Sequence, residues 1–225
     1  VGVLGYFLTI FLIQIGIALT GSAMASLINA LTPVSVTILA ALLLKETITP
    51  VKLLCLALAL AGTAVITQGA GSQSELLGIA AVLISVVFWG FASVFMRRLT
   101  AKYPAVLVTT YGMAISLIFH IPAGILAYAS QPVAFTPKIV LVVLYLGFFG
   151  SGVAQYTWTR CLSILPASTC SLFYPLQPVF AALLGAVILK ETFTSTFAIG
   201  LALISLDVVL STWETKKLAE AKEQK

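Results

Sequence analysis

Charged residues are scarce in this 225-residue sequence. Asp, Glu, Lys and Arg make up 8% of it and hydrophobic residues 60%, whereas about a quarter of an ordinary soluble domain is charged. A soluble fold of this size cannot bury so much apolar surface. Most of the chain lies in charge-free runs long enough to cross a bilayer, which takes a helix of about 20 residues. The composition therefore predicts an all-α integral membrane protein.

The residues of enzymatic chemistry are also scarce. Histidine occurs once, at position 120, and the three cysteines show no metal-like spacing. No Gly-rich phosphate loop precedes a helix, as an ATP-driven pump would require. The sequence thus argues against an enzyme, and we expect no catalytic residue, no cofactor and no metal. A proton gradient or another ion gradient is the expected energy source.

Gly, Pro and polar residues divide the apolar runs into eight expected spans. Of the twelve Lys and Arg residues, all but Lys138 and Lys190 fall on one side of these spans. Loops rich in Lys and Arg stay in the cytoplasm, so we expect a multi-pass protein of the inner (cytoplasmic) membrane with a cytoplasmic C-terminal tail at 214–225. The basic residues sit in short loops beside the spans, which does not favour nucleic-acid binding. The spans are expected near 1–19, 22–44, 51–68, 76–97, 105–128, 139–162, 167–189 and 196–213.

An internal repeat is the strongest signal. A shift of 145 positions aligns 22–66 with 167–211 without a gap, so that Pro33-Val34 recurs as Pro178-Val179. The same shift carries Leu-Lys-Glu-Thr from 44–47 to 189–192. The second span and its equivalent, the seventh, are five spans apart along the chain, an odd number, so the copies are expected to lie upside down relative to each other. This is the inverted-repeat plan of many secondary transporters.

The repeat also predicts the domain organisation. Residues 1–70 form the C-terminal part of a first repeat, with three helices, and residues 75–213 form a second repeat, with five. The shift places the start of the first repeat roughly 70 residues before residue 1, which leaves room for two further spans. We therefore expect an intact ten-helix (5+5) bundle, of which this N-terminally truncated chain contains eight helices.

This organisation resembles the drug/metabolite transporter superfamily, and within it the EamA-type ten-helix permeases. The resemblance rests on the stretch 167–192, on its partner 22–47, and on Phe88-Trp89-Gly90 near the start of the second repeat. It implies a basket of helices around a central cavity. It also implies the transport of small metabolites, often the export of amino acids or related compounds.

Two prolines mark the candidate hinges. Pro33 and Pro178 fall in the middle of their spans, where each removes a backbone hydrogen bond and frees the carbonyl four residues earlier. Polar residues cluster beside them at matching depths. We weigh two interpretations evenly: hinges with a substrate-facing polar cluster, or kinked helices whose polar groups bond to neighbouring helices. The polar residues concerned are Asn29, Thr32, Tyr174 and Gln177.

Further polar and aromatic residues complete the candidate site. Gln155 and Thr159 lie on one helix face with Ser151, and Trp89 lies near the middle of its span, where it could stack on a planar or cationic substrate. Packing against a neighbouring helix is the alternative for each. The predicted substrate-binding residues are Asn29, Thr32, Trp89, Gln155, Thr159, Tyr174 and Gln177.

The Leu-Lys-Glu-Thr motif is interpreted as structural. Lys45-Glu46 and Lys190-Glu191 are expected on opposite faces of the membrane, so one substrate-handling role cannot explain both. A lysine at a helix C-terminus instead complements the helix dipole. The predicted function is secondary transport of a small organic metabolite by alternating access, as an exporter. A membrane channel or a non-transporting scaffold is the alternative.

Overall fold

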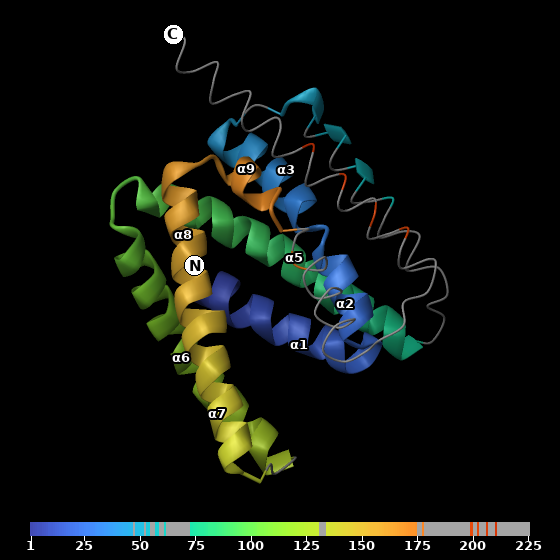
Figure 1. Cartoon of the computed structure of the whole chain (residues 1–225), viewed down its shortest axis with the longest axis vertical. Helices are drawn as coiled ribbons and strands as arrows, with labels where there is room; N and C mark the ends of the chain where they lie inside the picture. Colours follow the sequence, from blue (N-terminus) through green and yellow to red (C-terminus); the bar gives the residue numbers. More distant parts are fainter. Residues whose placement is uncertain are drawn as a thin grey trace.

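The structure is a computed structural model of the chain (Figure 1). Within the residues that it describes, every regular element is a helix. Four of these helices are long and apolar enough to cross a membrane. The described residues are 1–46, 48–51, 53–54, 57–58, 61, 73–130, 134–174, 177, 199, 202, 206 and 210.

The four long helices confirm four predicted spans. Two are uninterrupted: α5 is Gln73–Thr100 and α6 is Ala105–Ser130. The other two each contain a π-helical segment. The span Gly2–Thr20 consists of η1 (Gly2–Leu8) and α1 (Thr9–Thr20), and the span Pro137–Ile164 consists of α7 (Pro137–Tyr145), η2 (Leu146–Val153) and α8 (Ala154–Ile164). The predicted spans 51–68 and 196–213 fall mostly outside the described residues.

The predicted span 22–44 is not one helix but two. Helix α2 covers Ser22–Asn29 and α3 covers Thr32–Leu44, with a two-residue turn between them. Pro33 has no N–H to offer the carbonyl of Asn29, and the hydroxyl of Thr32 donates to that carbonyl instead, at 2.6 Å. The sequence predicted a loosened point here. The structure shows that the proline breaks the helix outright, because a side chain supplies the missing bond.

In the second copy of the repeat, the continuous described stretch ends at residue 174, and only single residues are described beyond it. Helix α9 (Ala167–Ser171) ends in a turn at 172–174, and Gln177 is helical again. Gln177 is the partner of Thr32 under the 145-residue shift. The shift also carries η1 at 2–8 onto 147–153, which η2 covers. The π-segments thus recur in the same register as the sequence repeat, and α9 begins at the place equivalent to the start of α2.

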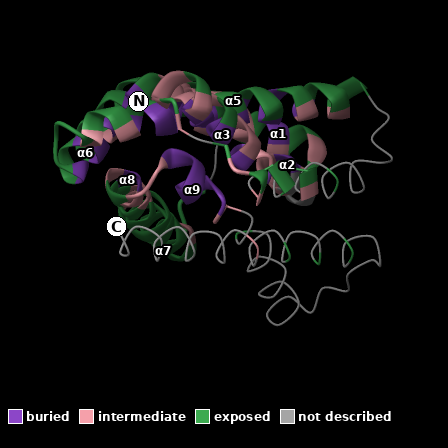
Figure 2. Ribbon diagram, turned by 90° about the horizontal axis from the view of Figure 1, so that it is seen from above, coloured by how far each residue is buried: buried purple, intermediate pink, exposed green. Residues whose placement is uncertain are grey.

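Helix α5 is the centre of the described bundle. It runs beside α1 over most of its length and also contacts η1, α2, α3, α8 and α9. Figure 2 shows the buried residues on the sides of α1, α3 and α5 that face one another. The approach is close because Gly16 of α1 faces Gly78 of α5. Small residues permit such contact between membrane helices.

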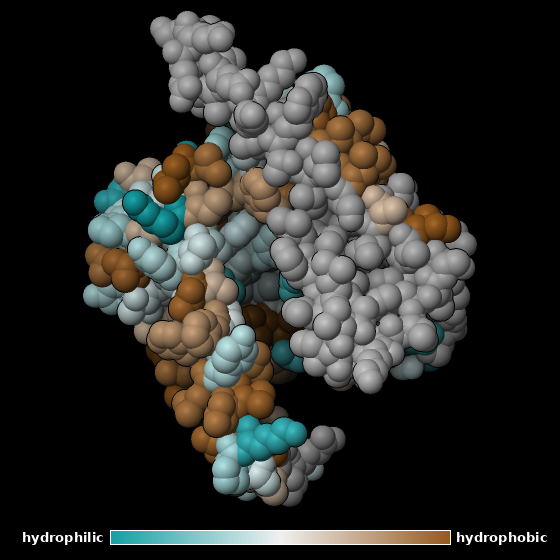
Figure 3. All heavy atoms as spheres, in the orientation of Figure 1, coloured by the Kyte–Doolittle hydropathy of each residue, from teal (hydrophilic) through white to brown (hydrophobic). Residues whose placement is uncertain are grey.

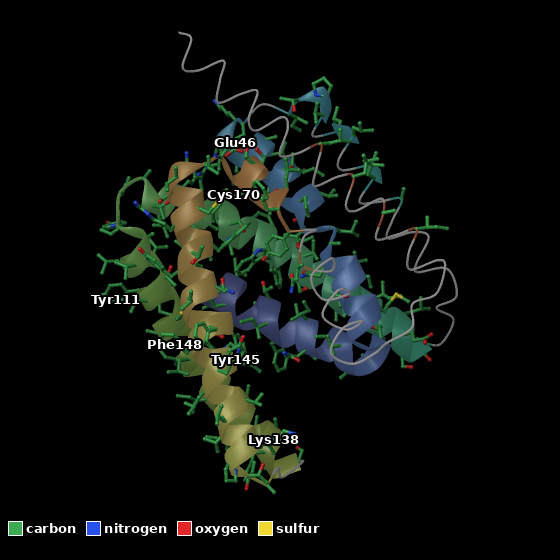
Figure 4. All side chains as sticks on the ribbon, in the orientation of Figure 1. Glu46, Tyr111, Lys138, Tyr145, Phe148 and Cys170 are labelled. Carbon is green, nitrogen blue, oxygen red and sulfur yellow. The ribbon has the colours of Figure 1, made fainter. Side chains whose placement is uncertain are left out.

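Basic side chains complete two helix ends at one end of the bundle. Arg97 donates to the carbonyl of Leu162 in the last turn of α8, at 2.7 Å, and Arg98 donates to the carbonyl of Leu43 in the last turn of α3. Cations stabilise helix C-termini, where carbonyls lack partners. Figure 4 places Glu46 near this end and Lys138 at the opposite end of the α7–α8 rod. Lys138 therefore lies at the opposite end of the bundle from Arg97 and Arg98.

The outer surface suits a lipid environment. Every residue from 140 to 150 is exposed, and most are large and apolar, including Leu141, Tyr145 and Phe148. Figure 3 shows this apolar surface at the lower end of the molecule, where α6 and α7 lie. An apolar surface of this extent would be costly in contact with water. The chain is a multi-pass membrane protein.

The glycines of η1 and η2 give a matched test of this packing. Gly5 faces α5 so closely that an added Cβ would lie 2.6 Å from the Cβ of Ala92, which cannot rotate away. We expect Gly5→Ala to destabilise the protein by about 1–3 kcal/mol. Gly150 occupies the equivalent place in η2 and is exposed, with only its own helix within 4 Å. Gly150→Ala should be neutral or slightly stabilising. Thermal unfolding in detergent would measure both, and equal effects would contradict the packing described.

Candidate functional site

Four aromatic side chains from four separate segments form a connected cluster in the bundle. The rings of Tyr6 and Trp89 have centroids 6.2 Å apart, as do those of Trp89 and Trp158. The ring of Tyr174 meets that of Trp158 edge-on at 5.1 Å. Tyr6 is 1% exposed and Trp89 is 5% exposed. The cluster joins η1, α5 and α8 to the turn that follows α9.

Glycines bring the cluster together. Gly112 of α6 lies against the ring of Tyr6, where an added Cβ would come within 2.7 Å of Cε2. Gly90 follows Trp89 on α5 and lies against Ser35 of α3. The close approach of η1 to Gly112 and of α3 to Gly90 positions the rings of Tyr6 and Trp89. Any larger residue at either position would push a helix outward.

Thr159 is the polar centre of the cluster. Its hydroxyl donates to the carbonyl of Gln155, one turn earlier on α8, at 2.9 Å. The hydroxyl of Tyr6 lies 3.4 Å from the hydroxyl of Thr159, and the sulfur of Met96 lies 3.8 Å from the same group. Thr159 is fully buried. These contacts tie η1, α5 and α8 together through one side chain.

Several buried polar atoms have no hydrogen-bond partner in the described structure, and three of them belong to Trp89 and Trp158 of the cluster and to Gln155, whose carbonyl Thr159 binds. They include indole N–H donors and an amide oxygen acceptor, and none of them carries a charge. Each unpartnered buried group costs about 1–3 kcal/mol. A cluster of such groups is therefore a place where a ligand could supply the missing bonds. The atoms are Nε1 of Trp89 and Trp158, Oε1 of Gln155, and the hydroxyl oxygens of Thr37, Ser93 and Thr109.

The structure brings together four of the seven predicted site residues: Trp89, Gln155, Thr159 and Tyr174. Asn29 and Thr32 instead bond to each other at the break between α2 and α3. Gln177 is exposed, and the second hinge residue, Pro178, lies outside the described residues. The role of the seven residues in substrate binding stays a prediction.

Two members of the cluster, Tyr6 and Trp158, are not among the predicted site residues. The span of Tyr6 is mostly apolar, and a single tyrosine there is easily taken for packing. A signal was available, because the 145-residue shift pairs Tyr6 with Ser151, which belongs to the polar stripe that includes Gln155. The two partners differ in the structure, since Tyr6 is buried and Ser151 is exposed.

Comparison with known proteins gives a consistent answer. The sequence profile of the EamA-like transporter family matches residues 1–68 and 76–213. A protein of known crystal structure, 25% identical in sequence, superposes with a TM-score of 0.76 over 96% of this chain and 76% of its own.

Curated relatives are named as transporters. An uncharacterized transporter of Archaeoglobus fulgidus is 27% identical over 93% of this chain, and the uncharacterized transporter YetK of Bacillus subtilis is 27% identical over 89%. A probable terminal-alkyne amino-acid exporter of Streptantibioticus cattleyicolor is 31% identical over 74% of the chain. The chain spans 74%, 62% and 56% of the lengths of these three relatives.

The unpartnered amide of Gln155 provides a stability test. Gln155→Met keeps a side chain of similar length and removes the buried oxygen that lacks a partner. We expect it to raise the free energy of unfolding by about 1 kcal/mol, because the desolvation cost of that oxygen disappears. Gln14→Met, at an exposed position of α1, is the matched control and should change little. Destabilisation by Gln155→Met in a thermal melt would show that the amide is satisfied.

Proposed function

This chain belongs to the EamA-like transporter family, and from that premise we propose that it is a secondary transporter that exports a small organic metabolite across the cytoplasmic membrane. It is a transporter rather than an enzyme. We propose further that it works by alternating access, driven by a proton gradient or another ion gradient. The observation that carries the proposal is the group of unpartnered, uncharged polar atoms beside four aromatic rings inside the bundle.

The aromatic cluster favours a substrate without net charge. Among the described residues, the hydrogen bonds and ring contacts of the four aromatic side chains involve no Asp, Glu, Lys or Arg. Indole N–H groups and the Gln155 oxygen can bond to a carboxylate and an ammonium of one zwitterion, whose ammonium can also lie over a ring face. The relative named as an amino-acid exporter supports the same class. We propose an amino acid or a related compound.

The repeated helix breaks support alternating access. Helix α2 ends before Pro33, and α9, which begins at the equivalent place in the second repeat, ends in a turn at 172–174. Secondary transporters with inverted repeats use such interrupted helices around a central site. We propose that Pro33 and Pro178 are hinge positions and that the intact protein is a ten-helix (5+5) bundle. The recurrence of η1 as η2 in the same register supports that plan.

Transport assays on the intact protein in proteoliposomes test the proposal. The panel would contain neutral amino acids, amines and nucleosides, each with and without an imposed proton gradient. We expect saturable uptake of a zwitterion and counterflow when unlabelled substrate is trapped inside. Flux that does not saturate and shows no counterflow would favour a channel. The absence of flux for every compound would favour a scaffold.

Thr159 provides the mutational test of the site. Thr159→Val keeps the shape of the side chain and removes the hydroxyl that binds the Gln155 carbonyl and faces Tyr6. We expect transport of the preferred substrate to fall about tenfold, the equivalent of one lost hydrogen bond. Thr157→Val, at an exposed position of the same helix, is the matched control and should transport normally. Equal rates in the two variants would remove Thr159 from the site.

A further inference from the structure

Glu46 joins the two repeats at one end of the bundle. Its Oε1 accepts a hydrogen bond from the backbone N–H of Ala167 at 2.9 Å, and its Oε2 accepts one from the N–H of Ser168 at 3.1 Å. The hydroxyl of Ser168 also donates to Oε2, at 2.5 Å. These three bonds, which we call the Glu46 clasp, link residues more than 120 positions apart. Both carboxylate oxygens are used, and the negative charge lies at the start of α9, where it complements the helix dipole.

The backbone turn at the end of α3 positions Glu46 beside the start of α9. Lys45, the residue after α3, adopts a left-handed conformation with φ 58°, which is uncommon for a residue with a side chain. The N–H of Glu46 then bonds back to the carbonyl of Ala40 at 3.3 Å. This turn ends α3 and directs the next side chain toward α9. Figure 4 shows Glu46 and Cys170 close together where α3 and α9 meet.

Helix α9 connects the clasp to the aromatic cluster. It is a single short helix, and the turn that follows it carries Tyr174, whose ring lies against Trp158. A displacement of α9 away from α3 would therefore also displace Tyr174 from the cluster. The adjoining ends of α3 and α8 are held separately, by Arg98 and Arg97 of α5. Arg97 holds α8 within the second repeat, whereas Arg98 holds the end of α3 across the repeats, as Glu46 holds the start of α9.

We propose that the Glu46 clasp is a gate contact of the transport cycle, made when this end of the bundle is closed and broken when it opens. The proposal rests on the transport function proposed above. Its partners suit reversible separation, because a carboxylate, two N–H groups and a hydroxyl near the end of the bundle can all be hydrated when they part. The contact also crosses from one repeat to the other, which is where inverted-repeat transporters open and close.

The first test measures opening without measuring transport. Cys170 lies next to the clasp and is 1% exposed, so its alkylation by a maleimide reports separation of α9. With Cys55 and Cys161 replaced by serine, we expect Glu46→Gln to speed alkylation at least about tenfold, a shift of one decade in the opening equilibrium. Lys45→Gln, which changes the exposed neighbour, should leave the rate unchanged. Equal alkylation rates in Glu46→Gln and Lys45→Gln would overturn the proposal, and the thermal midpoint of each variant would show that it is folded.

The second test separates a gate from a permanent joint. Cysteines at Glu46 and Ser168, in a background without native cysteines, would be joined by a short bis-thiosulfonate crosslinker and released by dithiothreitol. We expect crosslinking to stop transport reversibly. The control pair, cysteines at Arg160 and Ser163, bridges positions within α8 and should have no effect on transport. Undiminished transport by the crosslinked protein would overturn the gate. A wild-type protein that transports no compound would instead overturn the transport function.

Discussion

Helices in a membrane gain no hydrophobic energy by leaving lipid for one another, so their association depends on close contact between small residues. In the described bundle that contact is the approach of η1 and α1 to α5, made through Gly5, Gly16 and Gly78. The aromatic cluster depends on this approach, because Tyr6 reaches Trp89 and Thr159 only when η1 lies against α5 and α6. A lipid-facing rod such as α7 carries no comparable constraint.

Local patterns in the sequence predicted much of the fold. Charge-free runs identified four long helices within a few residues of their ends, since length and apolarity are what a bilayer requires. Pro33 indicated an interruption in the span 22–44, but it did not show that the span would be divided into two helices. The division depends on Thr32, whose hydroxyl replaces the bond that Pro33 removes. A side chain of this kind decides between a bend and a break, and the residue type alone does not show which rotamer it adopts.

The candidate site was harder to predict than the spans. Trp89, Gln155 and Thr159 stood out because polar and aromatic groups at mid-span are costly without a partner. Glu46 was interpreted as structural together with the rest of its motif, and its partners were not foreseen. Hydrogen bonds between Glu46 and α9 join segments 121 and 122 residues apart, and no local periodicity encodes such a pairing. Only the folded arrangement of the two repeats brings the start of α9 to the end of α3.

The π-helical segment η2 has a consequence for how the rod from Pro137 to Ile164 divides its faces. An α-helix turns about 100° per residue, so one extra residue in a wide turn rotates everything beyond it by that amount. Helix α7 has no buried residue, whereas α8 buries Thr159 and Leu162. The rotation at η2 thus sets which face of α8 meets the neighbouring helices, and that face carries Thr159 and Leu162. Deletion of a single residue in η2 would rotate α8 by about 100° and turn Thr159 toward the hydrocarbon, although the composition of the span would hardly change.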